Sequence, residues 1–111
     1  MNTSYFAKSA NNYYAVSICG RAPLWYLGRE YRILAPKIDF FKKYKEDGDE
    51  VYYTEQYHKR VLDQLDPHQV YKDLGENAVL LCYEKPEDFC HRFLVAKWLE
   101  KHIGIEIKEL E

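Results

Sequence analysis

The chain has 111 residues, of which 47% are hydrophobic and 31% charged, and its net charge is -2. This length and composition predict one globular domain over residues 1–111. The charge balance provides no global basic field that would attract nucleic acid. No stretch approaches the ~20 apolar residues of a membrane span, so we expect no membrane partner.

The N-terminal third predicts two short strands followed by a loop. Residues 3–6 and, more strongly, residues 13–18 combine aromatic and β-branched side chains between turn formers. Residues 19–37 are punctuated by Gly and Pro and predict a loop. Arg21 follows the second strand directly and is the main ligand-contact candidate of this loop, ahead of Arg29 and Arg32. In the alternative interpretation, Trp25 closes the edge of the core while the arginines lie in water.

Three helices are predicted in the middle of the chain. Pro36 suits the first position of a helix that Gly48 ends. Asp49 can cap a second helix over residues 50–65, and Asp66 caps a third that begins at Pro67 and ends before Gly75. The second helix has an apolar stripe of Val51, Thr54, His58, Val61 and Leu65, which predicts a packed His58 rather than a ligand-binding one.

The C-terminal third predicts a strand, a helix and a strand. Residues 78–83 form an unbroken apolar run, typical of a central parallel strand. A helix then runs through His102 to Gly104, and residues 105–108 form a half-exposed last strand. The element order predicts an α/β fold, a small Rossmann-like three-layer sandwich around a mostly parallel sheet of about four strands. Its site should lie at the carboxyl edge of the strands.

The turn between the penultimate strand and the last helix gathers five chemically active side chains: Cys82, Glu84, Cys90, His91 and Arg92. On a helical wheel Arg92 falls inside the sheet-facing stripe, so its guanidinium needs a partner. Glu84 is the expected partner, in a bidentate pair. Alternatively, Arg92 holds the phosphate or carboxylate of a ligand.

Cys90 and His91 are the candidates for catalysis. A thiol at a helix N-terminus beside positive charge favours the thiolate form, although Glu87 and Asp88 act against it. Neighbouring residues diverge by ~100° on a helix, so we expect that Cys90 and His91 do not pair with each other. Cys82 is assigned mainly to packing, with ligand contact as the alternative.

The three cysteines show no disulfide-scaffold spacing, which predicts reduced thiols in the cytoplasm. The spacing also differs from that of a zinc knuckle, so we expect no metal and no cofactor. A structural zinc held by Cys82, Cys90 and His91 stays open as an alternative.

These motifs resemble those of the domain-of-unknown-function family 488. The segment LLCYEKPEDFCHRFLVAKWL is similar to its signature of Cys-x-Glu at a strand end and Cys-His-Arg opening a helix. The segments SICGRAPLWYLGREYRILAPK and DEVYYTEQYHKRVLDQLDP resemble a short, phage- or bacterial-type subgroup. The resemblance implies a Rossmann-like α/β fold. It places the motif at Cys82, Glu84 and residues 90–92, with residues 20–23 upstream.

Two classes of function follow. In the first, an enzyme or binding domain takes a small anionic, nucleotide-like or nucleic-acid-derived ligand. Arg21 and Arg92 hold the anion, Glu84 orients Arg92, and Cys90 or His91 supplies the chemistry. In the second, the chain is a non-catalytic protein-interaction module and the Cys-His-Arg turn is structural. Nucleic acid itself is not indicated by the charge, and the sequence does not define an oligomeric state.

Overall fold

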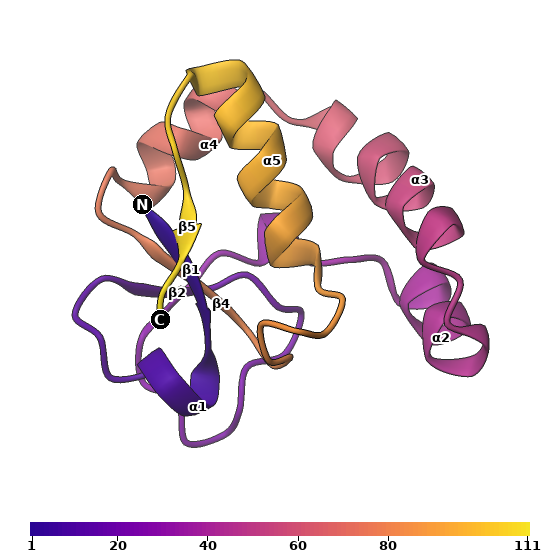
Figure 1. The fold of residues 1–111 in the computed structure, drawn as a ribbon, viewed down its shortest axis with the longest axis horizontal. Helices are drawn as coiled ribbons and strands as arrows, with labels where there is room; N and C mark the ends of the chain where they lie inside the picture. Colours follow the sequence, from indigo (N-terminus) through magenta and orange to yellow (C-terminus); the bar gives the residue numbers. More distant parts are fainter.

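A single parallel sheet is the centre of the fold. The computed structural model describes residues 1–111, and its strands lie in the order β3-β2-β4-β1-β5, with every pairing parallel (Figure 1). The α/β class and the parallel sheet are therefore confirmed. The strands are β1 (Asn2–Tyr5), β2 (Ala15–Ser17), β3 (Arg29–Glu30), β4 (Val79–Cys82) and β5 (Lys108–Glu109).

The sheet has five strands rather than about four, because β3 lies inside the expected loop. Its two residues pair with Val16 and Ser17 of β2 and are too short to produce a periodic sequence pattern. The last strand begins at Lys108 instead of residue 105. A four-residue helix, α1 (Phe6–Ser9), follows β1 directly and was not predicted.

The helices begin and end near their predicted boundaries. They are α2 (Ile38–Asp47), α3 (Glu50–Arg60), α4 (Pro67–Leu74) and α5 (His91–Ile103), with 3-10 turns at Arg32–Leu34 and Leu62–Gln64. Asp49 and Asp66 cap α3 and α4 as expected, and Gly48 and Gly104 end α2 and α5 in the left-handed conformation. None of these helices has the length and apolar character needed to cross a membrane.

Two boundaries differ from the prediction. Pro36 lies two residues before α2 instead of at its first position. The helix α3 ends at Arg60, and the predicted stripe is not its buried face. Val51 is 69% exposed, and Tyr53 and Tyr57 are buried in its place. Aromatic rings remove more surface from water than Val or Thr, which rotates the helix toward them.

Successive side chains of β2 and β4 point to opposite faces of the sheet and so divide the core into two clusters. Val16 and Leu80 belong to the larger cluster, beneath α3, α4 and α5. Ala15 and Leu81 belong to a smaller cluster with Phe6 of α1. This second face is covered by α1 and the loop that follows β2, so the expected third layer contains only a short helix. In Figure 1, α1 is a short helix at the end of β1, whereas α4 and α5 are longer helices.

The loop after β2 packs through a different aromatic residue from the one expected. Trp25 is 60% exposed, whereas the neighbouring Tyr26 is buried in the smaller cluster and its hydroxyl donates to the Arg29 carbonyl oxygen at 2.8 Å. Arg29 donates to the carbonyl oxygens of Asp73 and Leu74 at the end of α4. Arg29 is thus a structural residue that satisfies helix-terminal carbonyls.

The buried hydroxyl of Tyr57 provides a test of this packing. It donates to the Leu34 carbonyl oxygen at 2.6 Å and joins α3 to the 3-10 turn before α2. Tyr57→Phe leaves that carbonyl without its donor and should lower the free energy of unfolding by about 1–3 kcal/mol in urea titrations. Tyr13→Phe, at an exposed ring, is the control and should change nothing. Equal stability of the two variants would contradict this role.

Candidate functional site

A cavity of about 570 Å³ opens at the carboxyl ends of β2 and β4, which are adjacent in the sheet. Cys19, Gly20 and Arg21 line it from the chain leaving β2, and Tyr83 and Glu84 line it from the chain leaving β4. Cys90 and His91, at the start of α5, complete the inner wall. The cavity therefore lies at the strand edge where open α/β sheets bind ligands and where the element order predicts the site.

Aromatic side chains form the outer wall of the cavity. They come from the turn before α5, through Phe89, and from α2 and α3, which lie side by side at one end of the molecule (Figure 1). The Phe89 ring contacts the rings of Tyr44 and Tyr53, each with centroids 5.1 Å apart. The Tyr53 hydroxyl forms no hydrogen bond with another residue, so it is free to bond a molecule in the cavity.

Cys82 and Cys90 are joined by a disulfide, which contradicts the prediction of three reduced thiols. The two cysteines are eight residues apart, and the strand-turn-helix connection between them brings their side chains together. Cys82 is 1% exposed and does not line the cavity, whereas Cys90, at 4%, does. The packing role assigned to Cys82 was thus incomplete, because its sulfur is also covalently bound.

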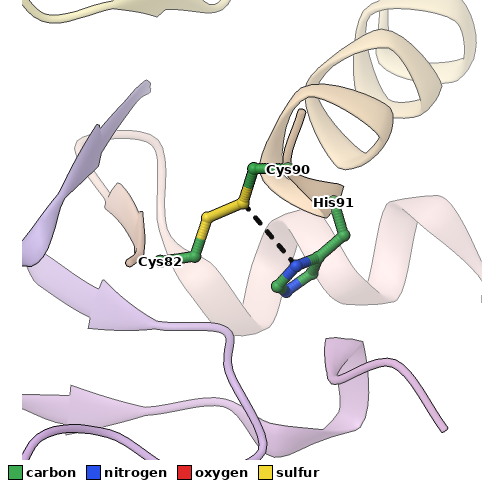
Figure 2. A group of neighbouring side chains, drawn as sticks. All are labelled: Cys82, Cys90 and His91. Carbon is green, nitrogen blue, oxygen red and sulfur yellow. Dashed lines mark hydrogen bonds between the residues drawn. A yellow bond between two sulfur atoms is a disulfide. The ribbon is translucent and has the colours of Figure 1, made fainter. Parts of the chain in front are cut away.

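Cys90 and His91 contact each other, contrary to the helical-wheel prediction. Figure 2 shows the imidazole of His91 turned toward the Cys90 sulfur, and Nδ1 lies 3.8 Å from Sγ. The wheel fails because Cys90 is the residue before the helix and has an extended backbone, with φ -153°. The 100° step between neighbours applies only inside a helix.

The tautomer of His91 follows from its second contact. Nε2 lies 2.8 Å from the Ile18 carbonyl oxygen, which can only accept, so Nε2 carries the hydrogen. Nδ1 therefore presents a lone pair to Cys90 in the neutral ring. Burial lowers the pKa of His91 to about 4, the Arg92 charge acts in the same direction, and the Ile18 carbonyl opposes them. His91 is uncharged at neutral pH.

Arg92 is fully buried, as the wheel predicted, but its partner is Glu109 instead of the Glu84 carboxylate. Nε and Nη2 donate to the two carboxylate oxygens of Glu109 at 3.0 Å. Nη1 donates to the Glu84 backbone oxygen at 2.8 Å and approaches the Cys82 sulfur to 3.0 Å. Arg92 does not line the cavity, and its N–H donors are directed at these groups. It is therefore not in position to hold a ligand.

The charged groups at the cavity are Arg21, Lys45 and Glu84. The Lys45 ammonium lies 3.7 Å from the Glu84 carboxylate. Glu84 therefore contacts Lys45 and contributes only its backbone oxygen to Arg92. The Arg21 side chain is exposed and forms no ion pair or hydrogen bond. Arg21 is accordingly the unpaired cation of the site.

Cys19 is the third cysteine and the only free one. It also lines the cavity, but burial raises the pKa of its thiol to about 12, with the Glu84 charge adding to the effect. The thiol form is inert as a nucleophile, so Cys19 is a lining residue without reactivity of its own.

Three potential metal-ligand atoms converge at this turn. The ligand atoms of Cys82, Cys90 and His91 lie within 4.8 Å of one another, although the wheel had separated Cys90 from His91. Two thiolates and one imidazole are a donor set that zinc accepts, with a fourth position left open. The disulfide would have to be reduced before these sulfurs could bind a metal.

The fold and the site define a small parallel-sheet α/β protein with a cysteine–histidine pair in an aromatic cavity at its strand edge. The chain belongs to the DUF488 family: the DUF488-N3a family model, described as the active DUF488-N3 subclade, matches residues 10–103. This confirms the resemblance drawn from the sequence motifs. Neither the curated proteins nor the solved structures contain a match.

Sequence reasoning missed Glu109, Lys45 and Tyr53. Glu109 lies 17 residues beyond Arg92 in a two-residue strand, and no local sequence pattern indicates that it pairs with Arg92. Lys45 belongs to a stretch of mixed charge, in which nothing distinguishes one lysine from its neighbours. Tyr53 carried the better signal, because it heads the aromatic pair that replaces the predicted stripe of α3.

The neutral state of His91 makes stability depend on pH. The pKa is about 4 in the folded protein and about 6.5 when unfolded, so between these values only the unfolded state binds the proton. Stability should therefore fall as the pH drops from 6.5 to 4, by roughly 3 kcal/mol for this group. In urea titrations His91→Gln, which keeps an N–H donor for Ile18, should lack this part of the loss. If the wild type and His91→Gln lose the same free energy of unfolding between pH 6.5 and 4, His91 is not responsible for the loss.

Proposed function

We propose that the cavity binds a small anionic ligand with a planar ring, held beside Cys90 and His91. The observation that carries this proposal is the unpaired Arg21 at the rim of an aromatic cavity. A guanidinium without a carboxylate partner favours phosphate or carboxylate groups, which it can bind through two N–H donors. The start of α5 at the same cavity adds free backbone N–H groups that also favour negative charge.

The shape of the cavity supports a ring. Its volume of about 570 Å³ matches the size of ordinary small-molecule sites. Phe41, Tyr44 and Phe89 offer ring faces and edges for stacking. The free hydroxyl of Tyr53 can fix a polar edge of the ring. A nucleotide combines the phosphate and the ring that these groups select, so nucleotides are the first ligand class to test.

The chemistry of the site rests on Cys90 and His91. In the reduced protein the Cys90 thiol lies beside the lone pair of His91 Nδ1, which can take its proton while the sulfur attacks an electrophilic atom of the ligand. The Ile18 carbonyl holds the imidazole in the required tautomer. A neutral His91 suits this role, and a neighbouring thiolate raises its pKa once the proton has moved. The description of the matching subclade as active is consistent with such chemistry.

Ligand binding can be tested with nucleoside monophosphates, ribose 5-phosphate and inorganic phosphate as probes. We expect a nucleoside monophosphate to raise the melting temperature of the wild-type protein more than phosphate alone. Arg21→Ala should weaken binding about tenfold or more in calorimetry, because a charge-assisted contact contributes about 1.5–3 kcal/mol.

Arg32→Ala is the matched control, since Arg32 is exposed, contacts only Glu30 and lies outside the cavity. Its binding should equal that of the wild type. If none of the probes binds, or if both variants bind equally, the anion site is wrong and the protein-interaction alternative becomes the better interpretation.

A zinc site is the second candidate, favoured by the convergence of Cys82, Cys90 and His91. Elemental analysis of protein purified under reducing conditions tests it directly. Stoichiometric zinc that disappears in His91→Gln would establish the site, because this substitution removes the imidazole ligand. Protein without zinc, even after reduction and incubation with the metal, would eliminate it.

A further inference from the structure

We propose that Cys82 and Cys90 are a redox-active pair that exchanges with a low-molecular-weight thiol entering the cavity. In this reaction Cys90 is the attacked sulfur, Cys82 is the leaving group, and Arg92 stabilises the Cys82 thiolate. The activity goes beyond the proposed ligand binding, because it needs neither an anion nor a ring in the cavity.

The two sulfurs differ in access. Both belong to the smaller core cluster, but Cys90 lines the cavity, whereas Cys82, at the end of β4, does not. A thiol that enters the cavity therefore meets the Cys90 sulfur first. This asymmetry, with one sulfur at the cavity and one away from it, sets which atom is attacked and which departs.

The protected sulfur has the environment of a leaving group. Arg92 Nη1 donates toward Cys82 Sγ at 3.0 Å, and the two contacts to Glu109 hold the guanidinium in that orientation. A guanidinium N–H stabilises a thiolate more than a thiol, and a leaving thiolate of lower pKa departs faster. The cavity-lining Cys19 has no such donor, and burial keeps its pKa high.

The first step is an exchange of one sulfur–sulfur bond for another. The thiolate of the small thiol attacks Cys90 Sγ, a mixed disulfide forms, and the bond to Cys82 breaks with its electron pair remaining on the Cys82 sulfur. A second small thiolate then attacks the small-molecule sulfur of the mixed disulfide. Cys90 leaves as a thiolate 3.8 Å from His91 Nδ1, and solvent protons complete the two thiols. Two small thiols are oxidised to one disulfide and the protein pair is reduced.

The proposed chemistry is compatible with a reducing compartment, where disulfides are usually transient and belong to catalytic or redox-sensing pairs. A bond between a cavity-lining and a buried sulfur fits that use. It also places Cys90 under redox control, since the sulfur is unavailable as a nucleophile while it is bound to Cys82.

Single cysteine variants test the assignment of the two sulfurs. Each variant is reduced, freed of metal with EDTA and incubated with oxidised glutathione, and the products are identified by intact-mass and peptide mass spectrometry. Cys82→Ser should accumulate one glutathione per chain on Cys90, because no second sulfur can release it. Cys90→Ser should react at least about tenfold more slowly, because Cys82 is shielded. Cys19→Ser is the control and should form the Cys82–Cys90 bond like the wild type.

The inference is overturned if the wild-type protein keeps three free thiols under these conditions. It is also overturned if Cys82→Ser and Cys90→Ser acquire glutathione at the same rate. Exchange with the uncharged disulfide of 2-mercaptoethanol separates this activity from the proposed ligand site, because this reagent carries no anionic group for Arg21 to bind and should still react at Cys90. The experiments can therefore show a failure of the anion-binding proposal and a failure of the thiol-exchange proposal independently.

Two substitutions test the role of Arg92 as a positioning residue. Arg92→Gln should slow reduction of the oxidised protein by glutathione about threefold or more, because Cys82 loses its charged donor. This change removes a buried guanidinium, so circular dichroism must first show that the variant is folded. Glu109→Gln keeps the guanidinium and removes its neutralising charge, so it should accelerate reduction. Slower or unchanged reduction in folded Glu109→Gln would contradict the assigned role.

Discussion

The buried guanidinium of Arg92 is the constraint on which the site depends. An unpaired charge in this interior would be strongly unfavourable, so the groups around it must be placed to accept its hydrogen bonds. They come from the last strand, through Glu109, from the end of β4, through Cys82, and from the turn that follows, through Glu84. Glu109 also accepts from Thr3 of β1, at 2.7 Å. Arg92 thus joins the start of α5 to β4 and β5, and Glu109 extends the connection to β1.

This connection explains how a short turn can hold a defined site. The turn after β4 is anchored at its start by Glu84 and Cys82, and at its end by His91, whose imidazole bonds the chain leaving β2. The cavity lies between these anchors, with the aromatic wall of α2 and α3 closing its outer side. The side chains that can do chemistry are therefore on fixed backbone, while the unpaired cation Arg21 lies on the exposed loop.

Local sequence signals predicted most of the fold and the strand edge at which the cavity lies. Asp49, Asp66, Gly48 and Gly104 mark helix ends through their own backbone chemistry, so their roles were readable without knowledge of distant contacts. The same is true of the apolar run of β4. The pairings within the site were not readable, because each depends on a residue outside the local pattern. Glu109 reaches Arg92 from another strand, and the extended backbone of Cys90 defeats the helical wheel.

The error about Cys90 is also the most informative one. A residue just before a helix has its own backbone geometry, so it can turn its side chain toward the first helical residue and toward the preceding strand at once. Cys90 uses this freedom to contact both His91 and Cys82. Cys82 and His91 consequently compete for one sulfur: bonded to Cys82 the Cys90 sulfur is protected, and released it faces the imidazole. The arrangement that makes Cys90 a nucleophile is therefore the same one that allows Cys82 to block it.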